Sequence, residues 1–173
     1  ILEPLVAYLA TQVAGPVQLT LDREECIAAT MIRPAQESTI TTTVAPDGQL
    51  LDMDVHTVLD AGGYATSSPG YAAAMAHKLT RLYRIPRYRH RGTVVYTNTP
   101  IAGGYRGWGA PDIMTCGEIH LDQVAKQAGL DPVALRMRNL VEPGDIDPIG
   151  NHHLGDARVR EFLQLGAEAF VWH

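Results

Sequence analysis

A glycine-rich stretch carrying an arginine and a tryptophan is the part of this sequence best suited to bind a ligand. It reads Gly103-Gly104-Tyr105-Arg106-Gly107-Trp108-Gly109 and runs directly into Ala110-Pro111-Asp112. Glycine lets the backbone approach a ligand closely and adopt positive φ angles, and the free N–H groups at the start of a following helix attract anions. The pattern predicts a site for an anionic ligand with a ring, with Trp108 as a flat wall. A tight strand-to-helix turn explains it equally well.

A second stretch, residues 77–91, concentrates positive charge. It holds six of the chain's 14 lysines and arginines, and Arg87, Arg89 and Arg91 alternate so that they would share one face of a strand. This face could be solvated or paired within the molecule, it could dock an acidic partner, or it could contact a nucleic-acid backbone. The net charge of −5 argues against nucleic acid as the main partner.

The other candidate residues form no reactive constellation. His152 and His153 lack a third ligand at a suitable spacing, so a pair of loop residues is expected rather than a metal site. Cys26 and Cys116 fit no metal or redox motif and are expected to be small buried apolar residues. Because no nucleophile triad or phosphate-binding loop is present, we assign no catalytic residue and no metal ligand to this chain.

Length and composition are those of a globular protein. The chain has 173 residues, of which 46% are hydrophobic and 19% charged, enough for one core or two small subdomains. No apolar run approaches the roughly 18 residues of a membrane span, and nothing points to an oxidising compartment. The first residues, Ile1-Leu2-Glu3-Pro4, lack an initiating Met and resemble no signal peptide, so we expect a piece of something larger that resides in the cytoplasm.

Hydrophobic periodicity predicts helices and strands in an irregular alternation. Asp22 and Glu25 predict a capping box that opens a short helix. Other helices are expected over residues 2–13, 69–82, 110–128, 131–140 and 158–170, strands over 17–21, 38–44, 51–59 and 91–97, and a loop over 142–153. The fold class is therefore α+β, with a mixed or antiparallel sheet and packed helices. Residues 1–173 form a single domain, or two subdomains over 1–100 and 101–173.

The strands over 38–44 and 51–59 are expected to form a hairpin, because Pro46-Asp47-Gly48 is a turn sequence. Alternation places Leu51 and Met53 on one face of the second strand. Asp52 and Asp54 then lie on the opposite face, where we expect solvent exposure.

Two longer segments resemble a known signature. Tyr96-Thr97-Asn98-Thr99-Pro100 and then Ala102 to Asp112 resemble the "TN-x-P…A-F-R-G-F-G-x-P-Q" pattern of the molybdenum-binding subunit of the xanthine dehydrogenase and aldehyde oxidase family. The similarity continues through the helix pair from Glu118 to Leu140 and through the opening segment from Pro4 to Glu25. It covers nearly the whole chain.

The resemblance implies a cofactor and a set of contacts. In this family the Gly-rich turn wraps molybdopterin, which is expected here in a dinucleotide form. The resemblance implies that the cofactor is bound by Gly104, Tyr105, Arg106 and Gly107. Arg106 would contribute its backbone amide. Trp108 would stand where the family keeps a phenylalanine against the substrate ring. Family enzymes hydroxylate an aldehyde or an N-heteroaromatic carbon with water as oxygen source, and electrons leave through iron–sulfur clusters to FAD or another acceptor.

Departures from the family pattern limit what this chain can do. A "G-G-x-F-G-x-K" cofactor loop and the "G-x-G-E" motif with the catalytic glutamate are both absent. The resemblance thus implies a portion that is inactive alone and that works with the remaining domains of the molybdenum subunit and with iron–sulfur and FAD subunits. A degenerate scaffold of the same fold is the alternative. No nucleic acid or membrane partner is expected. We do expect the chain to self-associate.

The substrate pocket is also expected to differ from that of xanthine enzymes. Counting back from Arg106 without gaps, the arginine that orients purines falls on Ala74, so Ala74 and Trp108 are the expected substrate contacts. Since alanine cannot replace a guanidinium, xanthine is disfavoured.

Overall fold

The computed structural model describes residues 2–172, and a three-stranded sheet is its central element. Strands β1 (Gln36–Val44), β2 (Leu50–Asp60) and β3 (Arg87–Val95) lie in that order across the sheet. β1 pairs antiparallel with β2 as a long hairpin, and β3 pairs parallel with β2. The sheet is therefore mixed, which confirms the predicted α+β class.

A β-bulge changes the face assignment in the second strand. The register shifts between Thr43 and Val44, since Thr43 pairs with Asp52 but Val44 pairs with Leu50. Leu51 is the extra residue, so Leu50, not Leu51, joins Met53 in the core. The expectation that Leu51 shares the buried face was wrong because alternation from Met53 does not continue through a bulge.

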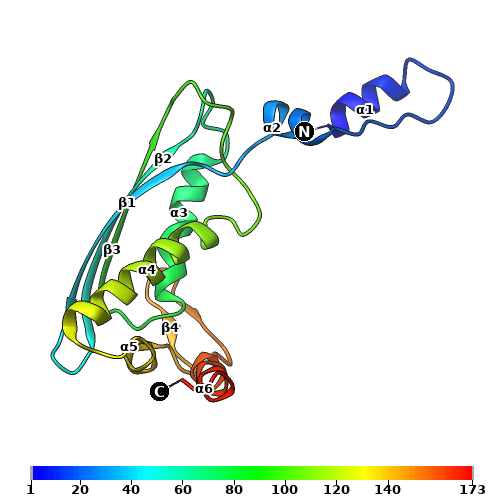
Figure 1. Ribbon diagram of the computed structural model, residues 1–173. Coiled ribbons are helices and arrows are strands. Elements are labelled where there is room, and N and C mark those ends of the chain that lie inside the picture. Colours follow the sequence, from blue (N-terminus) through cyan, green and yellow to red (C-terminus); the bar gives the residue numbers. More distant parts are fainter. Residues whose placement is uncertain (1, 173) are drawn as a thin grey trace.

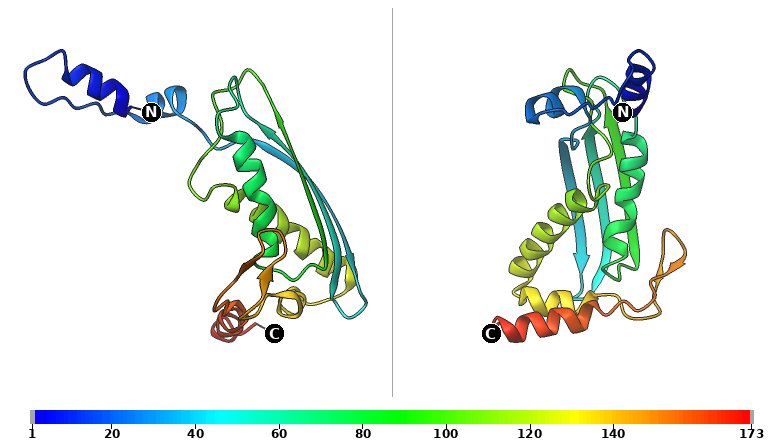
Figure 2. Two further views of the ribbon diagram at one scale, coloured as in Figure 1. Left: turned by 180° about the vertical axis from the view of Figure 1, so that it is seen from behind. Right: turned by 90° about the vertical axis from the view of Figure 1, so that its right-hand side faces the viewer.

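Two helices cover one face of this sheet (Figures 1 and 2). Helix α3 (Ser68–Thr80) connects β2 to β3 and packs on them, whereas α4 (Ala110–Ala128) lies beside α3 and reaches β1. The opposite face of β1 is polar and exposed, as is usual for a sheet covered on one side. Helices α5 (Pro132–Asn139) and α6 (Val159–Ala169) pack together beyond the C-terminal end of α4.

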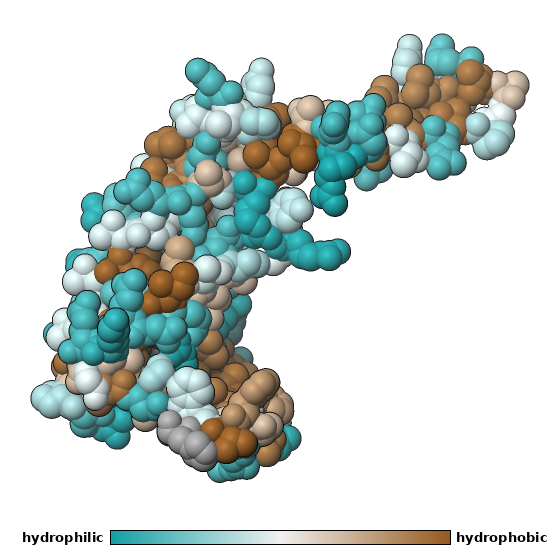
Figure 3. Space-filling view, in the orientation of Figure 1, coloured by the Kyte–Doolittle hydropathy of each residue, from teal (hydrophilic) through white to brown (hydrophobic). Residues whose placement is uncertain are grey.

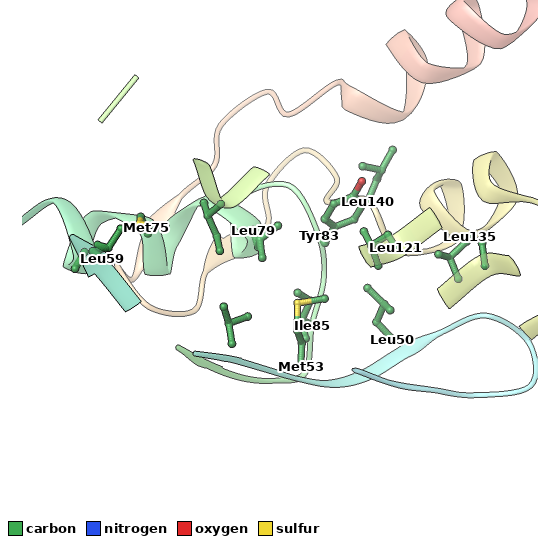
Figure 4. Close-up of a cluster of buried hydrophobic side chains, with 14 of the residues drawn as sticks. Leu50, Met53, Leu59, Met75, Leu79, Tyr83, Ile85, Leu121, Leu135 and Leu140 are labelled. Atoms are coloured by element: carbon green, nitrogen blue, oxygen red, sulfur yellow. The ribbon is translucent and has the colours of Figure 1, made fainter. Parts of the chain in front are cut away.

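The core fills the space between the sheet and these helices (Figure 4). Its fully buried members come from residues on both sides of position 100, and they include Leu50, Met53, Leu59, Met75, Leu79, Ile113, Leu121 and Leu135. Gly117 lets α4 approach α3, since a Cβ at this position would overlap Leu79.

The polar segment 142–153 contains a short hairpin, where the sequence predicted only a loop. Strands β4 (Ile146–Asp147) and β5 (His152–His153) pair antiparallel. Asp147 is fully buried and accepts hydrogen bonds from Thr80 and Arg81, so the hairpin is attached to the end of α3. Hydrogen bonds to a buried carboxylate help to hold this segment, and hydrophobic periodicity cannot reveal them.

The N-terminal residues form an arm that projects from the body (Figure 1). Helices α1 (Glu3–Ala10) and α2 (Arg23–Ala29) bury no residue, although the capping box predicted for α2 is present. Residues 17–21 are not a strand, which contradicts the prediction. Alternating residues form a strand only where a second strand accepts their hydrogen bonds, and none lies beside this segment in the structure described. No helix within residues 2–172 has the length and apolar character needed to cross a membrane.

We expect the arm to cause self-association. Leu5, Tyr8 and Leu9 on α1 are 49%, 63% and 38% exposed, and apolar side chains gather at this end of the molecule (Figure 3). Replacing Leu5 and Leu9 together with glutamate should lower the apparent mass in static light scattering. The charge-matched variant with Thr11 and Gln12 replaced by glutamate should not. Equal masses for both variants and the native chain would show that α1 is not the associating surface.

Candidate functional site

The Gly-rich loop, residues 103–109, is held at its base by the end of the sheet. Ala102 donates its N–H to the Ala61 carbonyl at 3.0 Å, and Gly103 donates to the Ile32 carbonyl at 3.1 Å. The next amide, of Gly104, donates to Ser67 Oγ at 2.8 Å, just before α3 begins. The loop therefore starts from a fixed position between the end of β2, the start of α3 and the segment that leads into β1.

The far end of the loop turns sharply into α4. Gly107, Trp108 and Gly109 have φ angles of 91°, 45° and 79°, three successive left-handed conformations. The Trp108 N–H donates to the Tyr105 carbonyl and the Ala110 N–H to the Gly107 carbonyl, both at 2.9 Å. Glycine adopts these angles readily, whereas Trp108 adopts one at a cost. The predicted tight turn and the predicted ligand site thus involve the same residues.

Trp108 forms one wall of the loop. Its ring stacks in a tilted geometry on Tyr71 of α3, with the ring centroids 5.8 Å apart, and the side chain stays 43% exposed. A Cβ on Gly104 would overlap the indole ring, so this glycine is what allows Trp108 to fold back over the loop. The result is an aromatic surface open to solvent on one side.

Ala74 lies on the same helix as the stacking partner of Trp108. Ala74 is half-buried on α3, one turn after Gly70. A Cβ added at Gly70 would stand 3.9 Å from the Trp108 ring. Residues four apart share a face of a helix. Ala74 therefore lies one helical turn along α3 from the residue that faces the Trp108 ring.

Three consecutive amides of the loop have no internal acceptor. Among the described residues, the N–H groups of Tyr105, Arg106 and Gly107 donate to no carbonyl or side chain. The Arg106 side chain is exposed and likewise makes no hydrogen bond or ion pair within residues 2–172. The Arg106 carbonyl, in contrast, accepts a hydrogen bond from Arg33 Nη2 at 2.8 Å.

Arg33 and Asp112 form a charged pair behind the loop that sequence reasoning missed. Arg33 Nη1 lies 2.7 Å from Asp112 Oδ2, and the Asp112 side chain is only 4% exposed. Tyr71 donates its hydroxyl to the same carboxylate oxygen at 2.6 Å. Burial and this hydrogen bond raise the pKa of Tyr71 to about 12, so the hydroxyl remains a donor at neutral pH. Asp112 belonged to the quoted motif, but no local signal singled out Arg33.

The other candidates lie outside this arrangement. Arg87 and Arg89 pair with Asp52 and Asp54 across β2 and β3, so of the alternatives for the basic face these two arginines show pairing within the molecule. The two aspartates are half-buried rather than freely solvated. Earlier in the run, Arg84 pairs with Glu142 and Asp145.

The histidine and cysteine candidates carry no site either. His152 and His153 are exposed in β5, and residues 2–172 contain no group of three or more His, Cys, Asp or Glu placed to hold a metal ion. Cys26 and Cys116 are half-buried, which corrects the expectation that they are buried residues.

Comparison with known proteins points to one family. A family described as "Molybdopterin cofactor-binding domain" matches residues 1–140. The chain is 34% identical over 171 residues to the xanthine dehydrogenase molybdenum-binding subunit of Escherichia coli O157:H7, which covers 98% of this chain and 23% of that protein. The structure of aldehyde oxidoreductase from Desulfovibrio gigas matches with a TM-score of 0.79 and 26% identity, over 86% of this chain and 16% of that one.

A second solved structure supports the fold. Quinoline 2-oxidoreductase from Pseudomonas putida 86 matches with a TM-score of 0.82 and 23% identity, over 98% of this chain and 22% of that one. In each of these comparisons the chain spans less than a quarter of the other protein's length.

Proposed function

Because the chain belongs to the molybdopterin cofactor-binding domain family, we propose that its Gly-rich loop holds part of a molybdenum–molybdopterin cofactor, in a dinucleotide form. Gly104, Tyr105, Arg106 and Gly107 are the proposed contacts. The observation that carries the proposal is the set of three successive amides, those of residues 105–107, that donate to nothing within residues 2–172.

The residues present suit such a group. Backbone N–H groups in a glycine-containing turn form concave sites for phosphate and other anions, and molybdopterin carries a phosphate. Gly104 and Gly107 allow the turn to fold tightly enough to present these amides, since a Cβ would overlap Trp108 at one and Pro111 at the other. The Arg106 contact is made by its amide, so its exposed guanidinium is not required to reach the cofactor.

The proposed activity is that of a cytoplasmic molybdenum hydroxylase, of which this chain supplies only a portion. When bound, the molybdenum group supplies the oxidation chemistry, with water as the source of oxygen. The chain's own residues bind the cofactor and shape the substrate side of the site. We propose that the remaining domains of the molybdenum subunit, together with iron–sulfur and FAD subunits, complete the enzyme, and that this chain is inactive alone.

The proposed substrate is an aldehyde or an uncharged N-heteroaromatic compound. Trp108 offers a broad flat surface for stacking a ring, and its open side is solvent-exposed. Ala74 places a methyl group, not a cation, on the same side of α3. An oxidised purine would find no charged anchor at Ala74, so an uncharged planar substrate fits this surface better.

Replacing Trp108 with alanine in the assembled enzyme tests this assignment. We expect KM for an aromatic substrate to rise by about fivefold, because loss of one aromatic stacking contact costs about 1 kcal/mol. The preference among substrates of different ring size should also change, while molybdenum content per subunit should stay near the native value.

Trp172 provides the matched control. Trp172 is 52% exposed, and its indole N–H donates a hydrogen bond to Asp131 at the other end of the molecule. Trp172→Ala should therefore leave KM unchanged. If Trp108→Ala instead removed molybdenum while the remaining active enzyme kept its ring preference, Trp108 would be a packing residue and the substrate assignment would be wrong.

A further inference from the structure

Arg33 contacts four residues in or directly behind the Gly-rich loop. Its Nη1 group donates to Asp112 Oδ2 at 2.7 Å and to the Tyr71 hydroxyl at 3.1 Å, and its Nη2 group donates to the Arg106 carbonyl at 2.8 Å. Its guanidinium carbon lies 4.7 Å from the centre of the Tyr105 ring. One side chain thus links α3 and α4 to two neighbouring loop residues.

We infer that Arg33 is a positioning residue for the Gly-rich loop: it holds the Tyr105–Arg106 segment so that the amides of residues 105–107 remain free for a ligand. The inference depends on the proposed function only for the identity of that ligand. Whether Arg33 orders the loop can be measured without any cofactor.

The geometry requires a guanidinium and not simply a positive charge. The two Nη groups of arginine diverge in a rigid plane, so one can remain on a carboxylate while the other reaches a carbonyl. Asp112 is almost fully buried and also accepts from Tyr71, and this fixes the orientation of the fork. The flat guanidinium can in addition stack on the Tyr105 ring, which favours one position for that residue.

A simpler role would be to neutralise the buried Asp112 carboxylate. Lysine distinguishes the two roles, because its single ammonium group could still pair with Asp112 but could not also hold the Arg106 carbonyl and stack on Tyr105. If Arg33 only neutralises Asp112, Arg33→Lys should behave like the native chain. If Arg33 positions the loop, Arg33→Lys should loosen residues 105–109 selectively.

Trypsin cleavage after Arg106 reports loop opening directly. The Arg106 side chain is exposed, and the carbonyl of the bond to be cut is the one that Arg33 holds. Under conditions where opening is fast relative to cleavage, the cutting rate follows the population of the open loop. Arg33 precedes Pro34, so trypsin does not cut there and the substitution changes no cleavage site.

The experiment uses mass spectrometry to measure the rate at which trypsin forms the fragments 1–106 and 107–173. It compares this rate for the native 173-residue chain and for Arg33→Lys. We expect cleavage after Arg106 to be about tenfold faster in Arg33→Lys, as for a local opening that is easier by about 1.4 kcal/mol. Arg89→Lys is the matched control, since Arg89 pairs with Asp54 far along the sheet, and it should cleave at the native rate. An unchanged rate in Arg33→Lys, or an equal increase in both variants, would overturn the inference.

A second variant covers the case in which Arg33→Lys fails to fold. Combining Arg33→Met with Asp112→Asn removes both charges together, so that no unpaired ion is left buried, and it should also cleave faster after Arg106. A native rate in a folded double variant would overturn the inference.

The link to the cofactor is tested separately in the assembled enzyme. Arg33→Lys should retain several-fold less molybdenum than native enzyme after extended dialysis, whereas Arg89→Lys should retain the native amount. Faster cleavage with undiminished molybdenum would show that Arg33 orders the loop but that the loop does not hold the cofactor, which would count against the proposed function and not against the ordering role.

Discussion

Replacing Gly109 with alanine is expected to lower the free energy of unfolding by about 3 kcal/mol. Gly109 is buried at the start of α4 with a φ of 79°, where an L-residue costs about 1–2 kcal/mol. A Cβ there would also lie 2.6 Å from Met75 Cγ and 3.4 Å from the Tyr71 carbonyl oxygen. Overpacking of this kind costs about 1–3 kcal/mol. Urea unfolding followed by circular dichroism measures the change.

Gly129 offers a control with the same backbone requirement and no crowding. It ends α4 with a φ of 67°, and no atom lies within 4 Å of its Cβ position. Gly129→Ala should therefore cost only the backbone contribution of about 1–2 kcal/mol. Equal losses for the two variants would mean that the space around Gly109 adjusts freely, and that the turn from the Gly-rich loop into α4 is less tightly packed than the structure indicates.

The buried carboxylate of Asp147 is expected to give this protein a marked acid sensitivity. Burial alone would raise the pKa of Asp147, but hydrogen bonds from Arg81, the Ile149 amide and Thr80 outweigh it and hold the pKa at about 2. His77 Nδ1 lies 3.3 Å from the same carboxylate. A carboxyl group whose pKa is lower in the folded than in the unfolded chain stabilises the fold at pH values above its unfolded pKa of about 4.

Asp147→Asn should thus reduce the free energy of unfolding by about 2 kcal/mol at pH 6. The difference between the native chain and the variant should shrink as the pH falls from about 4 to about 2, because the native carboxylate becomes protonated and loses its advantage. Chemical unfolding at pH 6 and at pH 2.5 measures both values. Asp156→Asn, at an exposed position, should show a difference near zero at both pH values. A loss for Asp147→Asn that is the same at both pH values would show that shape, and not charge, makes Asp147 important.

Local signals determined much of the secondary structure. Helix α4 begins at Ala110 and ends at Ala128 as predicted, because a strong apolar period is bounded by an early proline and a glycine in the left-handed conformation. The cap at Asp22 is also confirmed, since its side chain accepts a hydrogen bond from the amide of Glu25 three residues later. Such interactions lie within a few residues, so the sequence alone can reveal them.

Residues 17–21 and the bulge at Leu51 show where local reasoning fails. An alternating pattern is compatible with a strand, but only a neighbouring strand supplies the hydrogen bonds that make one. Which residue of β2 is inserted likewise depends on its pairing with β1. Both outcomes are set by partners distant in sequence.

The Gly-rich loop combines both kinds of information. Its glycines, its aromatic residue and the family resemblance were sufficient to predict from the sequence that it is the candidate binding segment. Only the tertiary structure identified Arg33, which lies 79 positions before Asp112 and 73 before Arg106. An arginine of ordinary local context becomes the support of the loop because packing of α3 and α4 on the sheet buries Asp112 beside it, and a buried carboxylate must find a cation.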